Sequence, residues 1–125
     1  MAESYLIDTS AVIKYLNGTF PENGLLLIDE IVDKKCSISF ISEIELQVWN
    51  PSNPEDAVVY QSFIKGSEII GLSPAIISET VRIRKECKVK LPDALIAATA
   101  LTNGWVLIAD NDKDFSRMNT RSDLY

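Results

Sequence analysis

The sequence predicts an α/β fold in three layers, α/β/α, with helices on both faces of a mostly parallel sheet. Short apolar runs alternate with longer segments of helical period, which is typical of βα units. Hydrophobic residues make up 46% of the 125 residues, enough for the core of one ordinary domain. Because no repeat, low-complexity segment or Gly/Ser linker interrupts the chain, residues 1–125 are expected to form a single domain.

In the amino-terminal half, each apolar run is followed by a segment with helical period. Gly18 is expected to end the first helix, because glycine readily takes the left-handed conformation beyond a helix end. Asn50 and Pro51 are expected to end another, because the residue before a proline disfavours the helical region. The predicted elements are a strand at 5–7, helices at 10–17 and 25–34, a strand at 36–40 and a helix at 41–49.

In the carboxyl-terminal half, prolines mark helix starts, since proline suits the first helical turn. Asn103 and Gly104 are expected to close the last helix. The predicted elements are a helix opening at Pro54, a strand at 68–72, helices at 74–87 and 92–101, and a strongly apolar strand at 105–109. The last ten residues are weakly patterned and are expected either to form a short edge strand or to fray.

The composition excludes several kinds of chemistry. Without any histidine, the chain has no Ser-His-Asp triad, no Cys-His pair and no imidazole ligand for zinc. Cys36 and Cys87 lie far apart and are interpreted as reduced, buried small side chains. No apolar run reaches the roughly 18 residues of a membrane span, and no signal-peptide pattern opens the chain. A cytoplasmic protein is therefore expected.

The net charge of −6 argues against a nucleic-acid partner, because phosphate binding usually requires a basic surface. The distribution of charge weakens that objection. Five of the twelve Lys and Arg residues fall within nine positions, namely Arg82, Arg84, Lys85, Lys88 and Lys90. This stretch is either a solvated helix face or an RNA-binding surface.

Two aspartates stand where helices begin. Asp8 directly follows the first strand, and ligands of open parallel sheets bind beyond the carboxyl ends of the strands. Asp8 could equally cap the following helix. Asp93 follows Pro92 in the first turn of a helix, where the helix dipole favours a carboxylate by about 0.3–1 kcal/mol. Each aspartate thus has a structural and a functional interpretation.

Glu45 is the more informative acid. On a helical wheel, Ile41, Ile44, Leu46, Val48 and Trp49 form an apolar arc. Glu45 falls near the middle of this arc and is predicted to point inward, whereas Glu43 falls on the opposite side and is predicted to face water. A buried carboxylate must be paired, protonated or bound to a metal. A structural ion pair is the alternative to a metal ligand.

Three further acids, Asp110, Asp112 and Asp114, alternate in a loop after the apolar strand at 105–109. Such a loop usually only turns or caps, but here it follows a core strand and should lie at the same edge as Asp8. The spacing superficially resembles a calcium loop, although the glycine and the later glutamate of that motif are missing. Carboxylates gathered at one edge repel each other, and Mg²⁺ or Mn²⁺ would relieve the repulsion, activate a water and accept a phosphodiester.

These residues resemble the PIN domain, in particular the VapC toxin nucleases of toxin–antitoxin pairs. The resemblance covers nearly the whole chain. It rests on Tyr5-Leu6-Ile7-Asp8-Thr9-Ser10, on Ile38-Ser39 leading into Glu45-Leu46, on Asp93-Ala94-Leu95-Ile96-Ala97-Ala98, and on the Asp-rich loop that ends in Phe115. Each piece is short, but their order and separation are specific.

The resemblance implies an endoribonuclease that uses Mg²⁺ or Mn²⁺. Its ligands would be Asp8, Glu45, Asp93 and an acid of the final loop, for which Asp112 is favoured over Asp114 and then Asp110. Thr9 or Ser10 would support the metal or the phosphate. The substrate would be single-stranded or looped RNA, commonly tRNA or rRNA, cut to leave a 5′-phosphate. The resemblance also implies a homodimer and an antitoxin whose carboxyl-terminal segment wraps the toxin.

Two other interpretations compete with the nuclease. A receiver-like signalling domain also gathers aspartates at the sheet edge, but it would need adjacent acids after the first strand, where this chain has Asp8-Thr9-Ser10. A PIN-like module that binds RNA or protein without cutting is the alternative function. The presence of all the expected acids favours the enzyme. On the enzyme interpretation, Arg82, Arg84, Lys85 and Lys88 would contact RNA.

Overall fold

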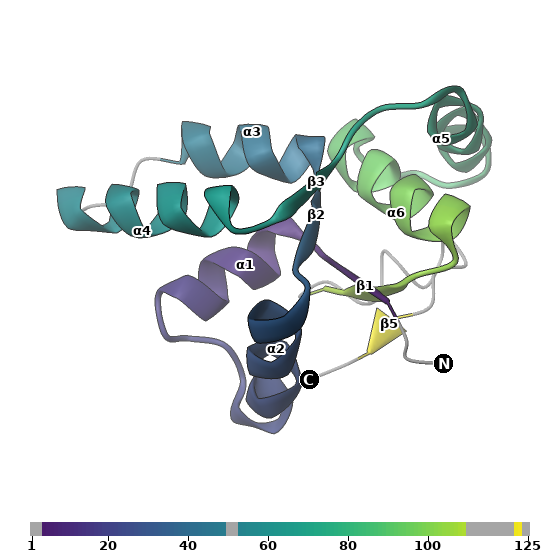
Figure 1. The fold of residues 1–125 in the computed structure, drawn as a ribbon. Coiled ribbons are helices and arrows are strands. Elements are labelled where there is room, and N and C mark those ends of the chain that lie inside the picture. Colours follow the sequence, from purple (N-terminus) through teal and green to yellow (C-terminus); the bar gives the residue numbers. More distant parts are fainter. Residues whose placement is uncertain (1–3, 50–52, 110–121, 124–125) are drawn as a thin grey trace.

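Parallel strands form the centre of the fold (Figure 1). The computed structural model describes residues 4–49, 53–109 and 122–123. One ladder has the order β1-β4-β5, with β1 at Tyr5–Ile7, β4 at Val106–Ile108 and β5 at Ser122–Asp123. The other joins β2 (Ser37–Ser39) to β3 (Glu68–Ile70). β1 lies beside β2, so the two ladders meet at the middle of the molecule.

Six helices connect these strands within the described ranges. They are α1 (Thr9–Leu16), α2 (Glu22–Lys34), α3 (Phe40–Val48), α4 (Pro54–Lys65), α5 (Pro74–Glu86) and α6 (Leu91–Asn103). The side chains of Asp8, Ser39, Asn53 and Ser73 accept hydrogen bonds from the first backbone N–H groups of α1, α3, α4 and α5. These bonds satisfy donors that have no partner inside the helix. Gly104, with a φ of 67°, ends α6 in the left-handed conformation.

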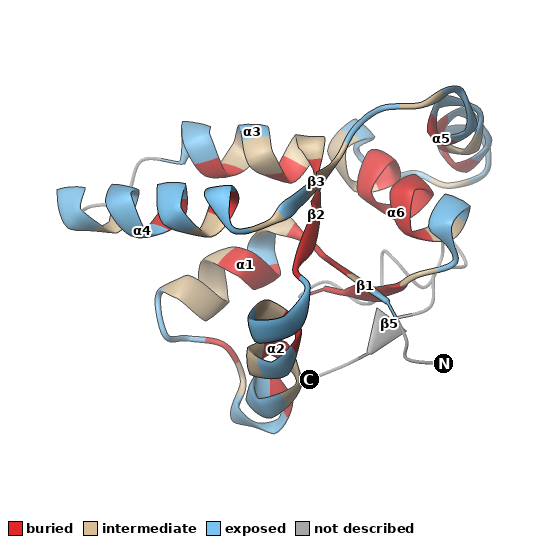
Figure 2. Ribbon diagram, viewed as in Figure 1, coloured by how far each residue is buried: buried red, intermediate tan, exposed pale blue. Residues whose placement is uncertain are grey.

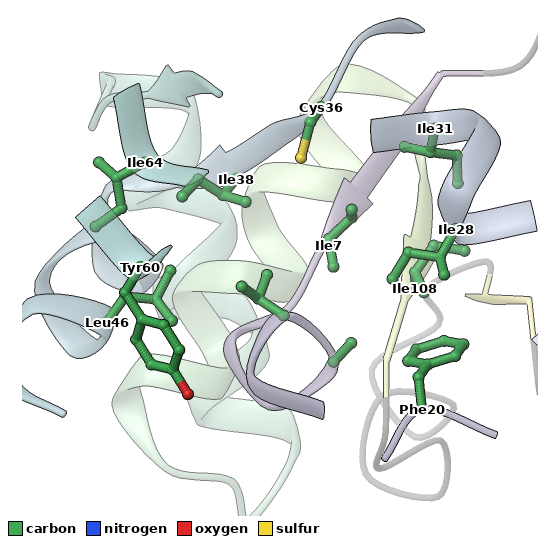
Figure 3. Packing of buried hydrophobic residues seen from close by; sticks show 12 residues of the cluster. Ile7, Phe20, Ile28, Ile31, Cys36, Ile38, Leu46, Tyr60, Ile64 and Ile108 are labelled. Atoms are coloured by element: carbon green, nitrogen blue, oxygen red, sulfur yellow. The ribbon is translucent and has the colours of Figure 1, made fainter. Parts of the chain in front are cut away.

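The strands separate two hydrophobic clusters, because alternate residues of a strand point to opposite faces. Leu6 and Leu107 pair in register and belong to the cluster under α5 and α6. Ile7 and Ile108 also pair in register, and they belong to the cluster with α1, α2 and α4 that Figure 3 shows in close view. Helices on both sides of parallel strands make the three-layer α/β fold that the sequence predicts.

α6 is the most deeply buried helix of the fold. Every residue from Ala94 to Ala100 is buried, and Figure 2 shows this helix and the central strands in red. Four of these seven positions are alanine, which lets α6 approach both α5 and the strands closely. Because Asp93 immediately precedes this buried run, its backbone is held by the core of the protein.

The predicted elements all occur, in the predicted order, with differences at their ends. The second helix begins at Glu22 rather than Leu25. The first strand has the predicted bounds, whereas β2, β3 and β4 are shorter than predicted, each three residues long. The last residues do contain an edge strand, β5, which pairs in parallel with β4. Cys36 is a buried free thiol as expected, whereas Cys87 is only half-buried.

A tyrosine links the first two helices. The Tyr15 hydroxyl donates to Asp29 Oδ1 at 2.7 Å. Burial, followed by this hydrogen bond, raises the pKa of Tyr15 to about 12. The hydroxyl therefore stays protonated and keeps its donor role through the neutral range.

None of the described helices is long and apolar enough to cross a membrane.

Candidate functional site

A pocket of about 500 Å³ lies where α1, α3 and α6 meet, beyond the carboxyl ends of β1 and β2. This is the edge at which open parallel sheets bind their ligands. One part of the lining is polar and the other is apolar. The lining residues are Asp8, Thr9, Ser10, Ile13, Ile44, Glu45, Val48, Trp49, Asp93 and Ile96. The structure therefore brings Asp8, Glu45 and Asp93, which are far apart in the sequence, to one pocket.

Asp8 performs the capping role that the sequence left open. Its Oδ1 accepts a hydrogen bond of 2.9 Å from the Ala11 N–H, and the residue is only 5% exposed. The backbone N–H of Asp8 donates to the Ile108 carbonyl, which holds the residue to the end of β4. A carboxylate has two oxygens and about four acceptor sites, so one capping bond does not prevent it from also binding a cation.

Glu45 is half-buried and lines the pocket, but the wheel prediction for α3 is wrong in its detail. The buried residues of α3 are Ser42 and Leu46, and Glu43 is half-buried instead of facing water. Much of the predicted apolar arc is exposed, with Ile44 at 52% and Val48 at 76%. The wheel assumed that an apolar arc packs on the core, whereas the carboxyl-terminal part of this arc forms a pocket wall. Glu45 points into the pocket from between these two faces.

Two hydroxyl groups hold the Glu45 carboxylate. Thr9 Oγ1 lies 2.5 Å from Glu45 Oε1 and 2.9 Å from Ser42 Oγ. A hydroxyl carries one proton, and an ionised carboxylate can only accept, so Thr9 donates to Glu45 and Ser42 donates to Thr9. Ser42 is fully buried. The chain Ser42, Thr9, Glu45 thus links the start of α1 to the middle of α3.

Asp93 lies in the first turn of α6, where the sequence predicted it. It is half-buried and reaches the pocket from the side opposite α1. No side chain caps this helix, whose N-cap residue is Lys90. The positive end of the helix dipole therefore favours the negative charge of Asp93.

The pocket gathers charge of one sign. Its described lining contains three carboxylates and no Lys or Arg side chain. Among the described residues, however, no three acidic, Cys or His side chains are close enough to form a ready-made metal cage. All the charged groups of the described lining are oxygen donors, the type that Mg²⁺ and Ca²⁺ bind. All-oxygen donors also suit Mn²⁺.

The structure describes the predicted supporting hydroxyl residues but not the predicted fourth ligand. Asp112 and its alternates Asp114 and Asp110 lie outside the described residues. The supporting residues Thr9 and Ser10 both line the pocket. Of these two, Thr9 contacts a carboxylate directly, while Ser10 is exposed.

The basic stretch lies on α5 and on the loop that leads to α6. Arg82 forms ion pairs with Glu79 and Glu86 on its own helix, so its charge is already compensated there. Arg84 donates to the Val89 carbonyl at 2.6 Å and, with Lys88 and Lys90, lines a separate shallow pocket of about 440 Å³. In the part of the chain that the structure describes, Lys85, Lys88 and Lys90 form no ion pair.

Sequence reasoning missed two residues of this site. Ser42 was treated as an ordinary helix residue, although a serine three positions before Glu45 lies on the same side of a helix. Trp49 was assigned to the core, whereas it is 46% exposed and lines the pocket. The break at Asn50-Pro51 was the available signal, because residues at a helix end often leave the buried face.

Comparisons with known proteins show the family and the fold of the chain. The model of the PIN domain matches residues 5–120. A toxin–antitoxin complex from Klebsiella pneumoniae contains a chain 30% identical, with a TM-score of 0.73, and the match covers 90% of this chain and 91% of that one. VapBC2 from Rickettsia felis, bound to a promoter DNA fragment, is 21% identical with a TM-score of 0.81 over 97% and 98% of the two chains.

A third solved structure, FitAcB from Neisseria gonorrhoeae, is 18% identical with a TM-score of 0.81 over 96% of each chain. No curated protein matches. The family match spans β1 to β4, the helices α1 to α6 and all three carboxylates of the pocket. The chain belongs to the PIN domain family.

Proposed function

We propose that this protein is a Mg²⁺- or Mn²⁺-dependent endoribonuclease and the toxin of a VapBC-type toxin–antitoxin pair. The observation that carries the proposal is the pocket that brings Asp8, Glu45 and Asp93 together beyond the carboxyl ends of the strands. Like charges in one pocket disfavour each other unless a cation compensates them. The family match and the toxin–antitoxin complexes among the structural neighbours support the same conclusion.

The residues of the pocket have distinct roles in this proposal. Asp8, Glu45 and Asp93, with Asp112 or its alternates Asp114 and Asp110, would hold the cation. When bound, the cation would lower the pKa of a water and compensate the charge of a phosphodiester. Thr9 fixes one oxygen of Glu45 and so sets the direction from which that carboxylate reaches the pocket. The buried run from Ala94 to Ala100, which directly follows Asp93, holds the backbone of this residue in place.

The substrate and partners are proposed on the same basis. RNA, for example tRNA or rRNA, would reach the pocket along Lys85, Lys88 and Lys90, with Arg84 held near Val89. The structural neighbours include toxin–antitoxin complexes, some of them bound to DNA fragments, and we propose an antitoxin partner here too. A homodimer could use the apolar row of Leu72, Ile77 and Val81, which are all about half exposed.

The test is cleavage of folded and single-stranded RNA by the purified protein with Mn²⁺ or Mg²⁺. Wild type should cut RNA to leave 5′-phosphates, and a chelator or Asp93→Asn should stop it. Glu30→Gln is the matched control, because it removes a carboxylate at the other end of the sheet. If Asp93→Asn cleaves as wild type does, or wild type never cleaves any RNA, the nuclease is excluded and the silent binding module remains.

A further inference from the structure

Trp49 is the aromatic member of the apolar pocket wall and lies one helical turn after Glu45. It follows α3 directly, and its backbone N–H donates to the Glu45 carbonyl at 2.9 Å. Its side chain is 46% exposed, and it lines the same pocket as Asp8 and Asp93. Exposed tryptophan is uncommon, because burying an indole contributes strongly to stability. An exposed indole in the lining of a charged pocket is therefore available to contact a ligand through its aromatic ring.

The indole is held in place by a neighbouring helix. The Trp49 side chain hydrogen-bonds the hydroxyl of Tyr60, a residue of α4 that is 5% exposed. The indole N–H is the only polar group of the ring and can only donate, so the Tyr60 hydroxyl accepts this bond. The indole thus has its polar group bound to α4, while the residue stays 46% exposed and lines the pocket. A ring fixed in this way loses little conformational entropy when it binds a ligand.

The pocket thus joins two kinds of surface that one nucleotide needs. The carboxylates, with the proposed cation, suit a phosphodiester. The apolar wall of Ile44, Val48 and Trp49 suits the flat face of a base, which is joined to the same phosphate through a single sugar. Any of the four bases can stack on an aromatic side chain. Such a wall can therefore bind single-stranded RNA of any sequence.

We infer that Trp49 is a stacking platform for a nucleobase next to the scissile phosphate, held in position by Tyr60. The inference rests on the proposed function, because it assigns the phosphate to the carboxylate side of the pocket. It adds a substrate subsite and a physical reason for the expected use of unpaired RNA, since a base inside a duplex has no free face to stack on Trp49.

The experiment uses the two tryptophans of the chain, Trp49 and Trp105. Trp105 lines a pocket at the opposite end of the sheet, so Trp105→Phe leaves Trp49 as the sole tryptophan reporter. This protein is titrated with a fluorescein-labelled nine-nucleotide single-stranded RNA of mixed sequence, with Ca²⁺ in place of Mg²⁺ to slow cleavage. The anisotropy of the labelled RNA measures binding. In parallel samples with unlabelled RNA, tryptophan emission measures contact with Trp49.

The expected result is that emission falls as anisotropy rises. An oligomer of the same length with abasic sugars should bind about tenfold more weakly and leave the emission unchanged. In the wild-type background, Trp49→Leu should weaken RNA binding about tenfold, whereas Trp49→Phe, which keeps an aromatic face, should remain within about threefold of wild type. The Trp105→Phe reporter keeps Trp49, so its titration remains a valid test even if Trp49→Leu folds poorly.

Three outcomes would overturn the inference. If anisotropy rises while emission stays constant and Trp49→Leu binds equally well, RNA binds without Trp49, and the proposed function survives. The inference fails in the same way if Trp49→Leu loses binding to a co-expressed antitoxin but not to RNA, which would make Trp49 a protein contact. If anisotropy never rises with any RNA, the proposed function fails together with the subsite.

Discussion

The pockets at the two ends of the parallel strands differ in their charged residues. At the amino ends, a pocket of about 360 Å³ is lined in part by Glu30, Lys34 and Lys35. Its charges are paired, because Lys34 Nζ lies 2.8 Å from Glu30 Oε1 and Lys35 Nζ lies 3.7 Å from Glu68 Oε2. At the carboxyl ends, three carboxylates line one pocket with no basic side chain among the described lining. Carboxylates that share one pocket repel each other, whereas exposed ion pairs contribute little to stability.

The largest expected effect separates the two roles of Asp8. Both Asp8→Asn and Asp8→Ala should lower RNA cleavage by about 100-fold or more, because each removes a negative ligand of the cation. Only Asp8→Ala should also lower the free energy of unfolding, by about 1 kcal/mol, since asparagine still caps a helix and alanine does not. Single-turnover cleavage and urea unfolding in chelator measure the two effects. Full cleavage by a well-folded Asp8→Asn would leave Asp8 only its capping role.

A smaller effect is expected from the hydroxyls that hold Glu45. Ser42→Ala and Thr9→Val should lower cleavage about tenfold and raise the Mn²⁺ concentration that gives half-maximal activity, because the carboxylate loses its fixed direction. Thr9→Ser keeps the hydroxyl and should retain the wild-type cleavage rate and Mn²⁺ dependence. Thr80→Val removes a buried hydroxyl that bonds the Ile76 carbonyl in α5 and serves as the control. An unchanged Mn²⁺ dependence in Ser42→Ala and Thr9→Val would show that the hydroxyl chain is purely structural.

Two residues of the basic stretch, Lys88 and Arg82, should differ a few fold in their contribution to RNA affinity. Lys88→Glu should weaken RNA binding and lower the slope of log K against log salt by about one, because an unpaired cation releases a counterion on binding phosphate. Arg82→Glu should change both quantities less, because Glu79 and Glu86 already pair with Arg82. Anisotropy titrations at several salt concentrations measure both variants. Equal slopes for the two proteins would contradict this division of the stretch.

The smallest effect concerns stability away from the pocket. The pKa of Tyr15 is raised to about 12 in the folded protein, above its unfolded value of about 10. Folding therefore keeps a proton that the unfolded chain loses, and this stabilisation is complete below pH 10 and is lost as the pH rises toward 12. Tyr15→Phe should show a shallower decline in the free energy of unfolding across that range. Identical pH profiles for Tyr15→Phe and wild type would rule out the linkage.

The order of elements was predictable because each one carries a local signal. Proline at the start of α4 and α5 and glycine after α6 mark positions that backbone geometry restricts. The start of α2 was not predictable in the same way. Glu22, Asn23 and Gly24 resemble a loop in composition, yet they form the first turn of the helix, and Gly24 is buried. Tertiary packing decides such a helix end.

The site was predictable to the extent that it depends on strand ends. Asp8 follows β1 and Asp93 lies in the first turn of α6, and both positions follow from the order of elements. The surroundings of Glu45 were not predictable, because a helical wheel cannot distinguish an apolar pocket wall from an apolar core contact. The exposure of Ile44, Val48 and Trp49 depends on where α1 and α6 lie, and that information is absent from α3 itself.

The binding of Mn²⁺, measured by the loss of the free-ion electron paramagnetic resonance signal, tests the central claim most directly. Wild type and Glu30→Gln should bind Mn²⁺ equally, and Asp93→Asn should bind it at least about tenfold more weakly, because the ion would be held at the carboxyl ends of the strands. If Asp93→Asn and Glu45→Gln both bind Mn²⁺ as tightly as wild type, the carboxylates at this end of the sheet are not a metal site.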